Sequence, residues 1–458
     1  MELINTIQNV LNMIVLGFII NLVSRGRTLD ALMVMLVGVL CAPLNIIGGQ
    51  AIPFAYLASA VLLAYVFLDV RRLKIPRNNF VFLLSAVICS SLFVEWLSTM
   101  ICVFAYAPLS VEWLTLLGRL RGVLVYSLSV VLAYSGLRNH PDVDGRKLSS
   151  KLLSALGISM FLNLIAVGVQ VVHPQFGFHL VRAWYTSESR ITIDAMEKIG
   201  MFSRFYGLNY SPVHLGFKSL LSFGGALFYM LMSHNAALNR KAIAVVFLTV
   251  INGALSFSKT FILGSVLCIL VFWPYHALQK LRHFPMVRIG TTRVLVVCCL
   301  FVGLAIIVVN VDKLQAATGL PFVHYFGKIA QSPLDAFSSR YRYQMAMPSA
   351  QLAWEVIQAH PLLGVGMTSM VGEFIGDSEY LVAMHNGGIV ALFLRLIEIG
   401  VILYVSLSRR LYMFFGLWLV SAMVGFAIPT LSTDLCLCLL GIFAGYVASW
   451  DSAMLKRS

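Results

Sequence analysis

The chain has 458 residues and a formal net charge of +14, and 59% of its residues are hydrophobic while only 11% are charged. Its mean hydropathy is +0.87. A soluble protein of this length would have too little polar surface to cover its core, so a soluble enzyme or binding domain is excluded. The composition predicts an all-α polytopic membrane protein.

The apolar runs give about 12 to 13 transmembrane helices, since one span needs roughly 20 mainly apolar residues. The first run lacks the basic region and cleavage site of a signal peptide, so it is interpreted as a span or an interfacial helix. The stretch 242–273 is interpreted as a hairpin of two short helices that turns near residues 257–260. The predicted segments are 7–23, 29–46, 53–68, 79–103, 117–136, 152–172, 211–232, 242–256, 260–273, 294–311, 387–406, 411–429 and 435–450.

Twenty of the 33 Lys and Arg residues lie in seven short gaps between these segments. Short cytoplasmic loops collect Lys and Arg, so all seven gaps are predicted to be cytoplasmic. This threading places the N-terminus in the periplasm and the C-terminus in the cytoplasm. The basic gap residues are Arg25, Arg27, Arg71, Arg72, Lys74, Arg77, Arg138, Arg146, Lys147, Lys151, Arg240, Lys241, Lys280, Arg282, Arg288, Arg293, Arg409, Arg410, Lys456 and Arg457.

Two connections are much longer than the others and fall on the external, periplasmic side of this threading. Loops of such length inside a compact membrane protein are usually functional, so we expect the chemistry there. The chain is accordingly divided into N-terminal membrane helices (1–172), a first long loop (173–210), central membrane helices (211–311), a large loop (312–386) and C-terminal membrane helices (387–458).

Sequence signatures of metal and nucleotide sites are missing from the chain. All eight Cys lie in apolar runs, and the ten His form neither an HExxH motif nor an i, i+4 pair. There is no GxxxxGK[ST] motif either. We therefore expect no metal, no cofactor and no nucleic-acid partner, and an activated substrate that is linked to a lipid.

The large loop contains a series of motif residues in a specific order. Ser339-Arg340-Tyr341-Arg342 is followed by Trp354, then by His360-Pro361-Leu362-Leu363-Gly364-Val365-Gly366, and then by Met384-His385-Asn386-Gly387 at the head of a membrane segment. This order of an Arg, a Trp, an "HPLLGVG" turn and an "HN" pair resembles the superfamily of O-antigen ligases, Wzy-type polysaccharide polymerases and exopolysaccharide polymerases.

Two earlier stretches extend the resemblance over roughly residues 200–410. The stretch from Arg204 to Pro212 is similar to the Arg…Gly…Asn-Pro segment of that superfamily, and 255–260 is similar to its hairpin motif. In that hairpin, Lys259 stands where the superfamily often has Arg.

The resemblance implies a metal-independent membrane glycosyltransferase of the GT-C type. Such an enzyme moves a glycan from an undecaprenyl pyrophosphate donor to an acceptor hydroxyl at the outer face of the bacterial inner membrane. Arg guanidinium groups stabilise the departing pyrophosphate through charge-assisted hydrogen bonds, and Arg204 and Arg340 are the main candidates. Lys259 and Arg342 are further candidates. The alternative for Arg340 and Arg342 is a solvated loop charge, and Arg340 is favoured over Arg342 because only Arg340 aligns with the motif.

His385 is the candidate general base, because a near-neutral imidazole can accept the proton of the attacking hydroxyl. Its expected place at a helix N-terminus would add positive potential, lower the pKa of the imidazole and favour a nearby anion. The competing interpretation is a plain helix-capping residue.

The expected partners are the lipid-linked donor, a glycan or lipid-linked acceptor, the bilayer and a chain-length regulator. A polymerase of lipid-linked repeat units is favoured, and a ligase that hands the glycan to lipid A core or another acceptor is the alternative. A small-anion transporter is an alternative from another class. It would place ionisable residues near the bilayer midplane on broken, repeated helices.

Several charged residues lie within or beside the apolar segments, where charge is usually paired or functional. Arg395 and Glu398 are spaced i, i+3 and are expected to neutralise each other. Lys218 either snorkels or lines a donor cavity. Arg119 and Arg121 either contact pyrophosphate or belong to ordinary helix packing. Glu95 has no assigned role.

Overall fold

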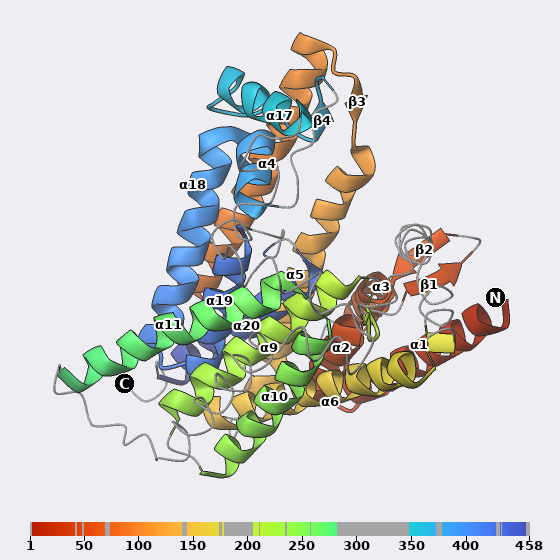
Figure 1. Cartoon of the computed structure of the whole chain (residues 1–458), viewed down its shortest axis with the longest axis vertical. Coiled ribbons are helices and arrows are strands. Elements are labelled where there is room, and N and C mark those ends of the chain that lie inside the picture. The colour runs from red at the N-terminus through yellow and green to blue at the C-terminus, as the bar shows by residue number, and fades with distance from the viewer. Residues whose placement is uncertain are drawn as a thin grey trace, which may run out of the picture.

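The structure is a computed structural model that describes residues 2–41, 44–47, 50–68, 74–139, 144–173, 176–177, 205–209, 211–233, 236–256, 258–281, 348–371, 378–426, 431 and 433–454. These residues form thirteen helices and four short strands. Eight of the helices are long and apolar enough to cross a membrane. The chain is therefore an all-α multi-pass membrane protein (Figure 1).

The helices are α1 (Glu2–Ser24), α2 (Thr28–Cys41), α3 (Phe54–Leu68), α4 (Asn79–Tyr106), α5 (Trp113–Asn139), α6 (Gly145–Val172), α9 (Pro212–Met232), α10 (Ala236–Leu255), α11 (Lys259–Leu281), α17 (Pro348–Ala359), α18 (Glu379–Ser408), α19 (Tyr412–Val424) and α20 (Asp434–Met454). The strands are β1 (Leu44–Ile47), β2 (Gln50–Pro53), β3 (Ser110–Val111) and β4 (Thr368–Ser369). They pair antiparallel as β1 with β2 and β3 with β4.

The predicted turn within 242–273 is confirmed, but its two helices are longer than the predicted short ones, since α10 begins at Ala236 and α11 ends at Leu281. Helix α10 closes with a hydrogen bond from Ser256 N to Asn252 O, and α11 opens with Phe261 N and Ile262 N donating to Ser258 O. The turn between the two helices therefore lies where the sequence predicts it, near residues 257–260.

Other predicted segments differ from the helices that form. The segment 29–46 is wrong at its end, because α2 stops at Cys41 and β1 starts at Leu44. The sequence has Pro43 at this point, and a proline disfavours helical backbone at the residue before it. The predicted span 294–311 lies outside the described residues.

Short polar side chains fix where several helices begin. Asn78 Oδ1 accepts from Phe80 N at 2.9 Å at the start of α4, and Asp144 Oδ1 accepts from Lys147 N at 2.9 Å at the start of α6. These side chains satisfy backbone N–H groups that have no partner inside the helix.

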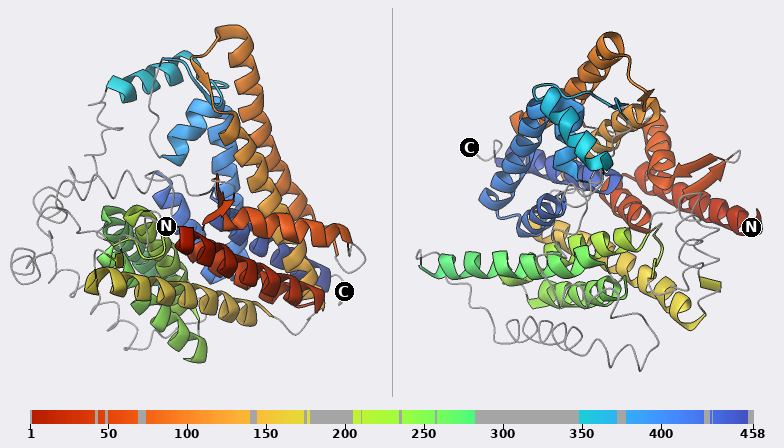
Figure 2. Two further views of the ribbon diagram at one scale, coloured as in Figure 1. Left: turned by 90° about the vertical axis from the view of Figure 1, so that its right-hand side faces the viewer. Right: turned by 45° about the horizontal axis from the view of Figure 1, so that its top comes forward.

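Small residues bring the central helices close together. In α20, Gly441 lies against Ser129 and Gly445 against Ala133, both of which are on α5. Helix α9 is buried along nearly its whole length, and its Gly224 lies against Val420 on α19. Small residues allow such close backbone approach between membrane helices. The helices α9, α10 and α6 form a layer beside α4 and α18 (Figure 2).

The basic gaps are joined to one another by polar contacts. Lys151 pairs with Asp30, which also binds Arg27 at 2.8 Å. Arg409 Nη2 lies 2.6 Å from Asp451 Oδ1. The remaining links are Lys74 to Asn139, Asn78 to Asp451, and Lys241 to Ser150. Among the described residues, these gaps therefore share one side of the molecule, which we call the basic end.

The connections predicted to be external are also joined to one another. Strand β3, from the 104–116 connection, pairs with β4 from the large loop. Glu379 N donates to Gly425 O at 2.8 Å, which links the start of α18 to the end of α19. Helix α17 and strands β3 and β4 lie together near one extremity of the molecule, beside the end of α4 and beyond the start of α18 (Figure 1).

Candidate functional site

Helix α18 is interrupted directly after the His385-Asn386 pair of the "HN" motif. Gly387 (φ −144°, ψ 15°) and Gly388 (φ 63°, ψ −158°) have non-helical backbone. Glu379 Oε1 nevertheless lies 3.2 Å from Arg395 Nη2, sixteen positions along the chain. A straight helix would hold their Cα atoms about 24 Å apart, because each residue adds about 1.5 Å. The chain therefore turns sharply at the two glycines and divides α18 into the halves 379–386 and 389–408.

The "HPLLGVG" turn closes onto the end of the first half. Val365 N donates to His385 O at 2.7 Å, and Gly366 N donates to Asn386 O at 3.1 Å. These two carbonyls have lost their helical partners because the helix stops at Gly387. The turn thus supplies the missing donors from a segment about twenty residues earlier in the chain.

The same turn closes the start of the second half. Ile389 N donates to Pro361 O at 2.8 Å, and Val390 N donates to Leu362 O at 3.4 Å. The expected position of His385 at a helix N-terminus is therefore wrong. His385 lies in the last turn of the first half, and the leading N–H groups of the second half already have carbonyl partners.

The glycines of the turn are required by this close packing. Gly364 (φ +63°) and Gly366 (φ +71°) adopt the left-handed conformation that other residues rarely adopt. A Cβ at Gly364 would collide with the carbonyl oxygen of His385, and one at Gly366 would collide with the backbone of Thr99 on α4.

The side chains of His385 and Asn386 form a buried pair. His385 Nδ1 lies 2.9 Å from Asn386 Oδ1, and Asn386 Nδ2 donates to Met367 Sδ at 3.2 Å. Because the amide NH₂ is directed at the sulfur, its oxygen faces the imidazole and accepts from Nδ1–H. An imidazole that donates from Nδ1 in its neutral form has its lone pair on Nε2. His385 is only 1% exposed.

Thr99 connects this junction to α4. Its Oγ1 accepts from Met367 N at 3.0 Å and donates to Glu95 O at 2.7 Å. Thr99 therefore holds the "HPLLGVG" segment against α4, one helical turn from Glu95.

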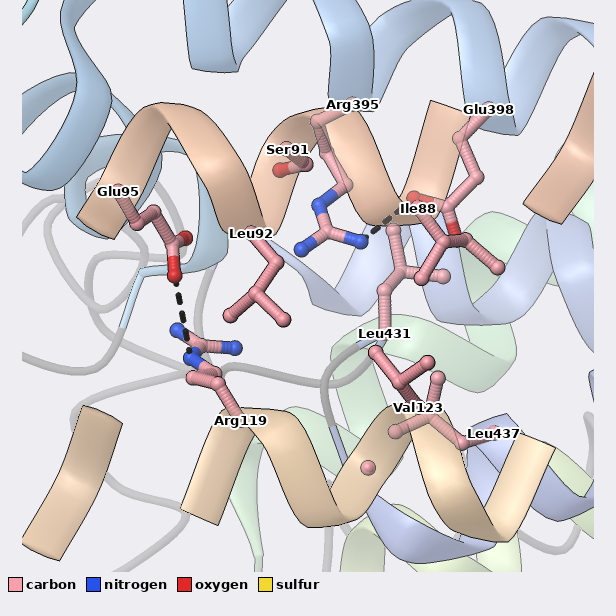
Figure 3. Close-up of a pocket in the computed structure, with 11 residues that line it drawn as sticks. Ile88, Ser91, Leu92, Glu95, Arg119, Val123, Arg395, Glu398, Leu431 and Leu437 are labelled. Atoms are coloured by element: carbon pink, nitrogen blue, oxygen red, sulfur yellow. Dashed lines mark hydrogen bonds and ion pairs between the residues drawn. The ribbon is translucent and has the colours of Figure 1, made fainter. Parts of the chain in front are cut away.

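A buried charge cluster lies next to this junction (Figure 3). Arg395 Nη1 lies 2.6 Å from Glu398 Oε2, which confirms the predicted pair, and Arg395 Nη2 contacts Glu379. Arg119 Nε on α5 lies 3.7 Å from Glu95 Oε2 on α4. The cavity between these groups is lined by Ile88, Ser91, Leu92, Glu95, Arg119, Gly122, Val123, Arg395, Glu398, Leu431 and Leu437. His385 is not part of that lining.

Arg121 and Lys218 have structural partners. Arg121 Nη2 lies 3.1 Å from Asp434 Oδ1 at the start of α20. Lys218 Nζ donates to Val39 O at 3.2 Å and to Leu40 O at 2.8 Å. These are the last carbonyls of α2, so Lys218 closes the end of that helix.

Two amide side chains of α6 hold the segment that follows Arg204. Gln170 Oε1 accepts from Tyr206 N at 2.9 Å and from Gly207 N at 3.1 Å, while its Nε2 donates to Gly207 O at 3.0 Å. Asn163 Oδ1 accepts from Leu208 N at 2.9 Å. The segment 205–209 is thereby fixed against one face of α6; we call this arrangement the amide clamp.

Most of the predicted pyrophosphate ligands lie outside the described part of the chain. This applies to Arg204, Arg340 and Arg342. Lys259 is the first residue of α11, and its side chain is also outside the described part. The structure therefore positions the neighbours of these residues, through the amide clamp and the "HPLLGVG" junction.

Sequence reasoning missed Thr99, Asn163, Gln170 and Glu379. A signal for two of them is visible in the sequence, because Asn163 and Gln170 are polar residues seven positions apart inside an apolar run. That spacing places both on one face of a helix. No protein-family profile matches the chain, and no curated protein matches it.

Proposed function

We propose that this protein polymerises lipid-linked oligosaccharide repeat units at the periplasmic face of the bacterial inner membrane. The observation that carries the proposal is the closure of the "HPLLGVG" turn onto the "HN" break of α18. These are the two strongest pieces of the resemblance, about twenty residues apart in sequence, and their backbones are directly hydrogen-bonded.

The proposed chemistry uses His385 as the general base. The acceptor hydroxyl attacks the anomeric carbon of the donor, the bond from that carbon to the pyrophosphate oxygen breaks, and the hydroxyl proton moves to His385 Nε2. Asn386 Oδ1, 2.9 Å from Nδ1, holds the tautomer that leaves Nε2 as the acceptor. Arg204 and Arg340 are the proposed ligands of the departing pyrophosphate, with Lys259 and Arg342 as further candidates.

The burial of His385 adds a conformational step to this proposal. With 1% of its surface exposed, His385 cannot meet a sugar hydroxyl while the turn is closed. In the proposed cycle, the turn moves away from the α18 break when acceptor binds. Closure of such loops around substrates is a common way to exclude water from a transfer reaction.

The proposed orientation follows from charge. The basic end is rich in Lys and Arg in short connections, which favours the cytoplasmic side. The large loop leads to the opposite side, where a lipid-linked donor and a glycan acceptor would meet.

The test is a reconstitution with defined substrates. Purified protein in lipid nanodiscs is given a lipid-linked repeat unit, and the products are separated by length. A polymerase produces a ladder of longer lipid-linked glycans from this substrate alone. A ligase produces transfer only when lipid A core is added, and no transfer under either condition would refute the proposal.

A small-anion transporter is the second candidate, because an interrupted helix lies beside buried charges. The cavity is lined by two carboxylates and two guanidiniums, and each guanidinium is paired with a carboxylate, so the lining has no excess of positive charge to hold an anion. Uptake of a labelled anion into proteoliposomes, without any glycan product, would favour this candidate.

A further inference from the structure

One corner of the basic end is built from four separate parts of the chain. It is formed by the connection before α4 and by the last turns of α5, α18 and α20. Lys74 Nζ donates to Asn139 Oδ1 on α5 at 3.1 Å. Asp451 on α20 accepts from Asn78 Nδ2 at 3.0 Å and pairs with Arg409 at the end of α18. These contacts join the four parts into one surface, which we call the basic corner.

The basic corner has an excess of positive charge. Asp451 is the one carboxylate among its described residues, and it is already paired with Arg409. Five cations against this one carboxylate leave an excess of four positive charges. The five cations of the corner are Lys74, Arg77, Arg138, Arg409 and Arg410.

Four of these cations have no carboxylate partner in the described part of the chain. Lys74 donates to an amide oxygen, and Arg138 Nη1 donates to the hydroxyl of Tyr134 at 2.8 Å. Arg77 and Arg410 are exposed and form no ion pair with a described carboxylate. The nearest acidic side chain of the neighbouring helix start, Asp144, caps α6. The four cations are therefore accessible to an anion from outside the chain.

Arg77 and Arg410 lie on either side of the same carboxylate. Each is next in sequence to a residue that contacts Asp451, since Asn78 and Arg409 are its two partners. Arg410 also has a φ of +56°, in the left-handed region where glycine commonly follows a helix. An arginine at a position that favours glycine points to a use for its side chain.

The basic corner also exposes apolar side chains. Ile75, between two of the cations, is 75% exposed, and Trp450 at the end of α20 is 38% exposed. Phe82 in the first turn of α4 and Tyr404 near the end of α18 are exposed on helices that are apolar enough to cross a membrane. Aromatic side chains at helix ends are typical of the membrane–water interface. The corner therefore lies where the lipid-facing surface meets the headgroup region.

We propose that the basic corner binds the headgroup of an anionic phospholipid in the leaflet that faces the basic end. Lys74, Arg77 and Arg410 hold the lipid phosphate through charge-assisted hydrogen bonds, and Ile75 contacts the acyl chains. Basic clusters beside membrane helices recognise anionic lipids in this way. A soluble phosphate would use the cations but not Ile75. The proposal is independent of the glycan transfer proposed above.

The first test counts the bound lipids by native mass spectrometry. Purified protein in micelles is titrated with phosphatidylglycerol, which is anionic, or with phosphatidylcholine, which has no net charge. The wild type should bind one phosphatidylglycerol more tightly than phosphatidylcholine. Arg77→Gln combined with Arg410→Gln should weaken this binding about thirtyfold, because each basic residue near an anionic headgroup contributes about fivefold.

The matched control is Arg146→Gln combined with Arg240→Gln. It also removes two exposed arginines of the basic end that form no ion pair with a described carboxylate, so it should keep the affinity of the wild type. Equal weakening in the two double variants would overturn the proposal, because the basic end would then attract lipid through its total charge alone. Equal affinity of the wild type for the two lipids would overturn it as well.

Thermal unfolding in micelles separates a lipid from a soluble phosphate. Phosphatidylglycerol should raise the midpoint of the wild type, since a ligand that binds only the folded chain stabilises it. Glycerol phosphate at the same concentration should not. Ile75→Ser should reduce the rise while leaving the midpoint without added lipid unchanged. An equal rise with glycerol phosphate, or a full rise in Ile75→Ser, would contradict the proposed lipid.

Discussion

The two ends of the molecule are held together by different kinds of contact. At the basic end, side chains such as Arg409 and Asp451 form ion pairs while about a quarter to a third of each side chain remains exposed. At the α18 break, the contacts are buried, and they are backbone hydrogen bonds and the ion pairs of Arg395. Exposed ion pairs contribute little, whereas breaking a buried pair is strongly destabilising.

This difference separates two uses of positive charge. The basic residues in short gaps are suited to orienting the chain in the membrane, and their pairing is secondary. Arg395, in the second half of α18, instead forms an ion pair with Glu379 in the first half and thereby holds the two halves together. The contrast leads to four stability measurements, all as the free energy of unfolding in mixed micelles.

The largest expected effect is that of Arg395→Ala. This substitution leaves the carboxylates of Glu379 and Glu398 buried without their cation, so we expect a loss of about 3–5 kcal/mol. The double variant with Glu398→Gln should lose less than Arg395→Ala alone, because one of the two stranded charges is removed. Equal losses would show that the cluster does not act as a unit.

The next effect is that of Gly364→Ala in the turn. A left-handed alanine costs about 1–2 kcal/mol, and its Cβ would also displace the carbonyl of His385. The matched control is Gly400→Ala in the second half of α18, where an added Cβ meets no atom within 4 Å. It should stabilise by about 0.5–1 kcal/mol. Similar responses at both positions would contradict the proposed packing of the turn.

Gln170→Ala should have an intermediate effect. It removes the partners of Tyr206 N, Gly207 N and Gly207 O, but the freed segment can turn these groups towards water, so we expect a total loss of about 1–3 kcal/mol, the cost of one buried group left without a partner. Hydrogen exchange should become faster at the amides of 206 and 207 and remain slow within α9. Unchanged exchange at these amides would mean that the amide clamp does not hold the segment.

The smallest effect is expected for Arg409→Ala at the basic end. Its pair with Asp451 is partly exposed, so the loss should be about 0–1 kcal/mol and should shrink further at high salt. A loss as large as that of Arg395→Ala would remove the distinction between the two ends.

The sequence was sufficient for features that depend on local pattern. Hydropathy located most helices and the hairpin between α10 and α11, and the i, i+3 spacing predicted the pair of Arg395 and Glu398. Each of these depends on residues close together in the chain. The resemblance also pointed to the "HPLLGVG" turn and the "HN" pair, which are hydrogen-bonded to each other at the α18 break.

Features that depend on the direction of the chain could not be predicted. Hydropathy measures the length of an apolar run and does not report a sharp turn within it, so it predicts the start of a span at 387, where the helix breaks at Gly387 and Gly388. The contact between Glu379 and Arg395 exists only because of that turn. Gln170 likewise meets residues 206–207 from another segment, a pairing that periodicity alone cannot specify.

The most direct test of the proposed glycan transfer is a single comparison in the reconstituted assay. The transfer rate from a lipid-linked donor is measured for the wild type, His385→Ala and the exposed control His173→Ala. Loss of a general base should slow transfer by about 10²- to 10⁴-fold, while His173→Ala should match the wild type. If His385→Ala is well folded and transfers glycan at the rate of the wild type, His385 is not the base and the proposed site is wrong.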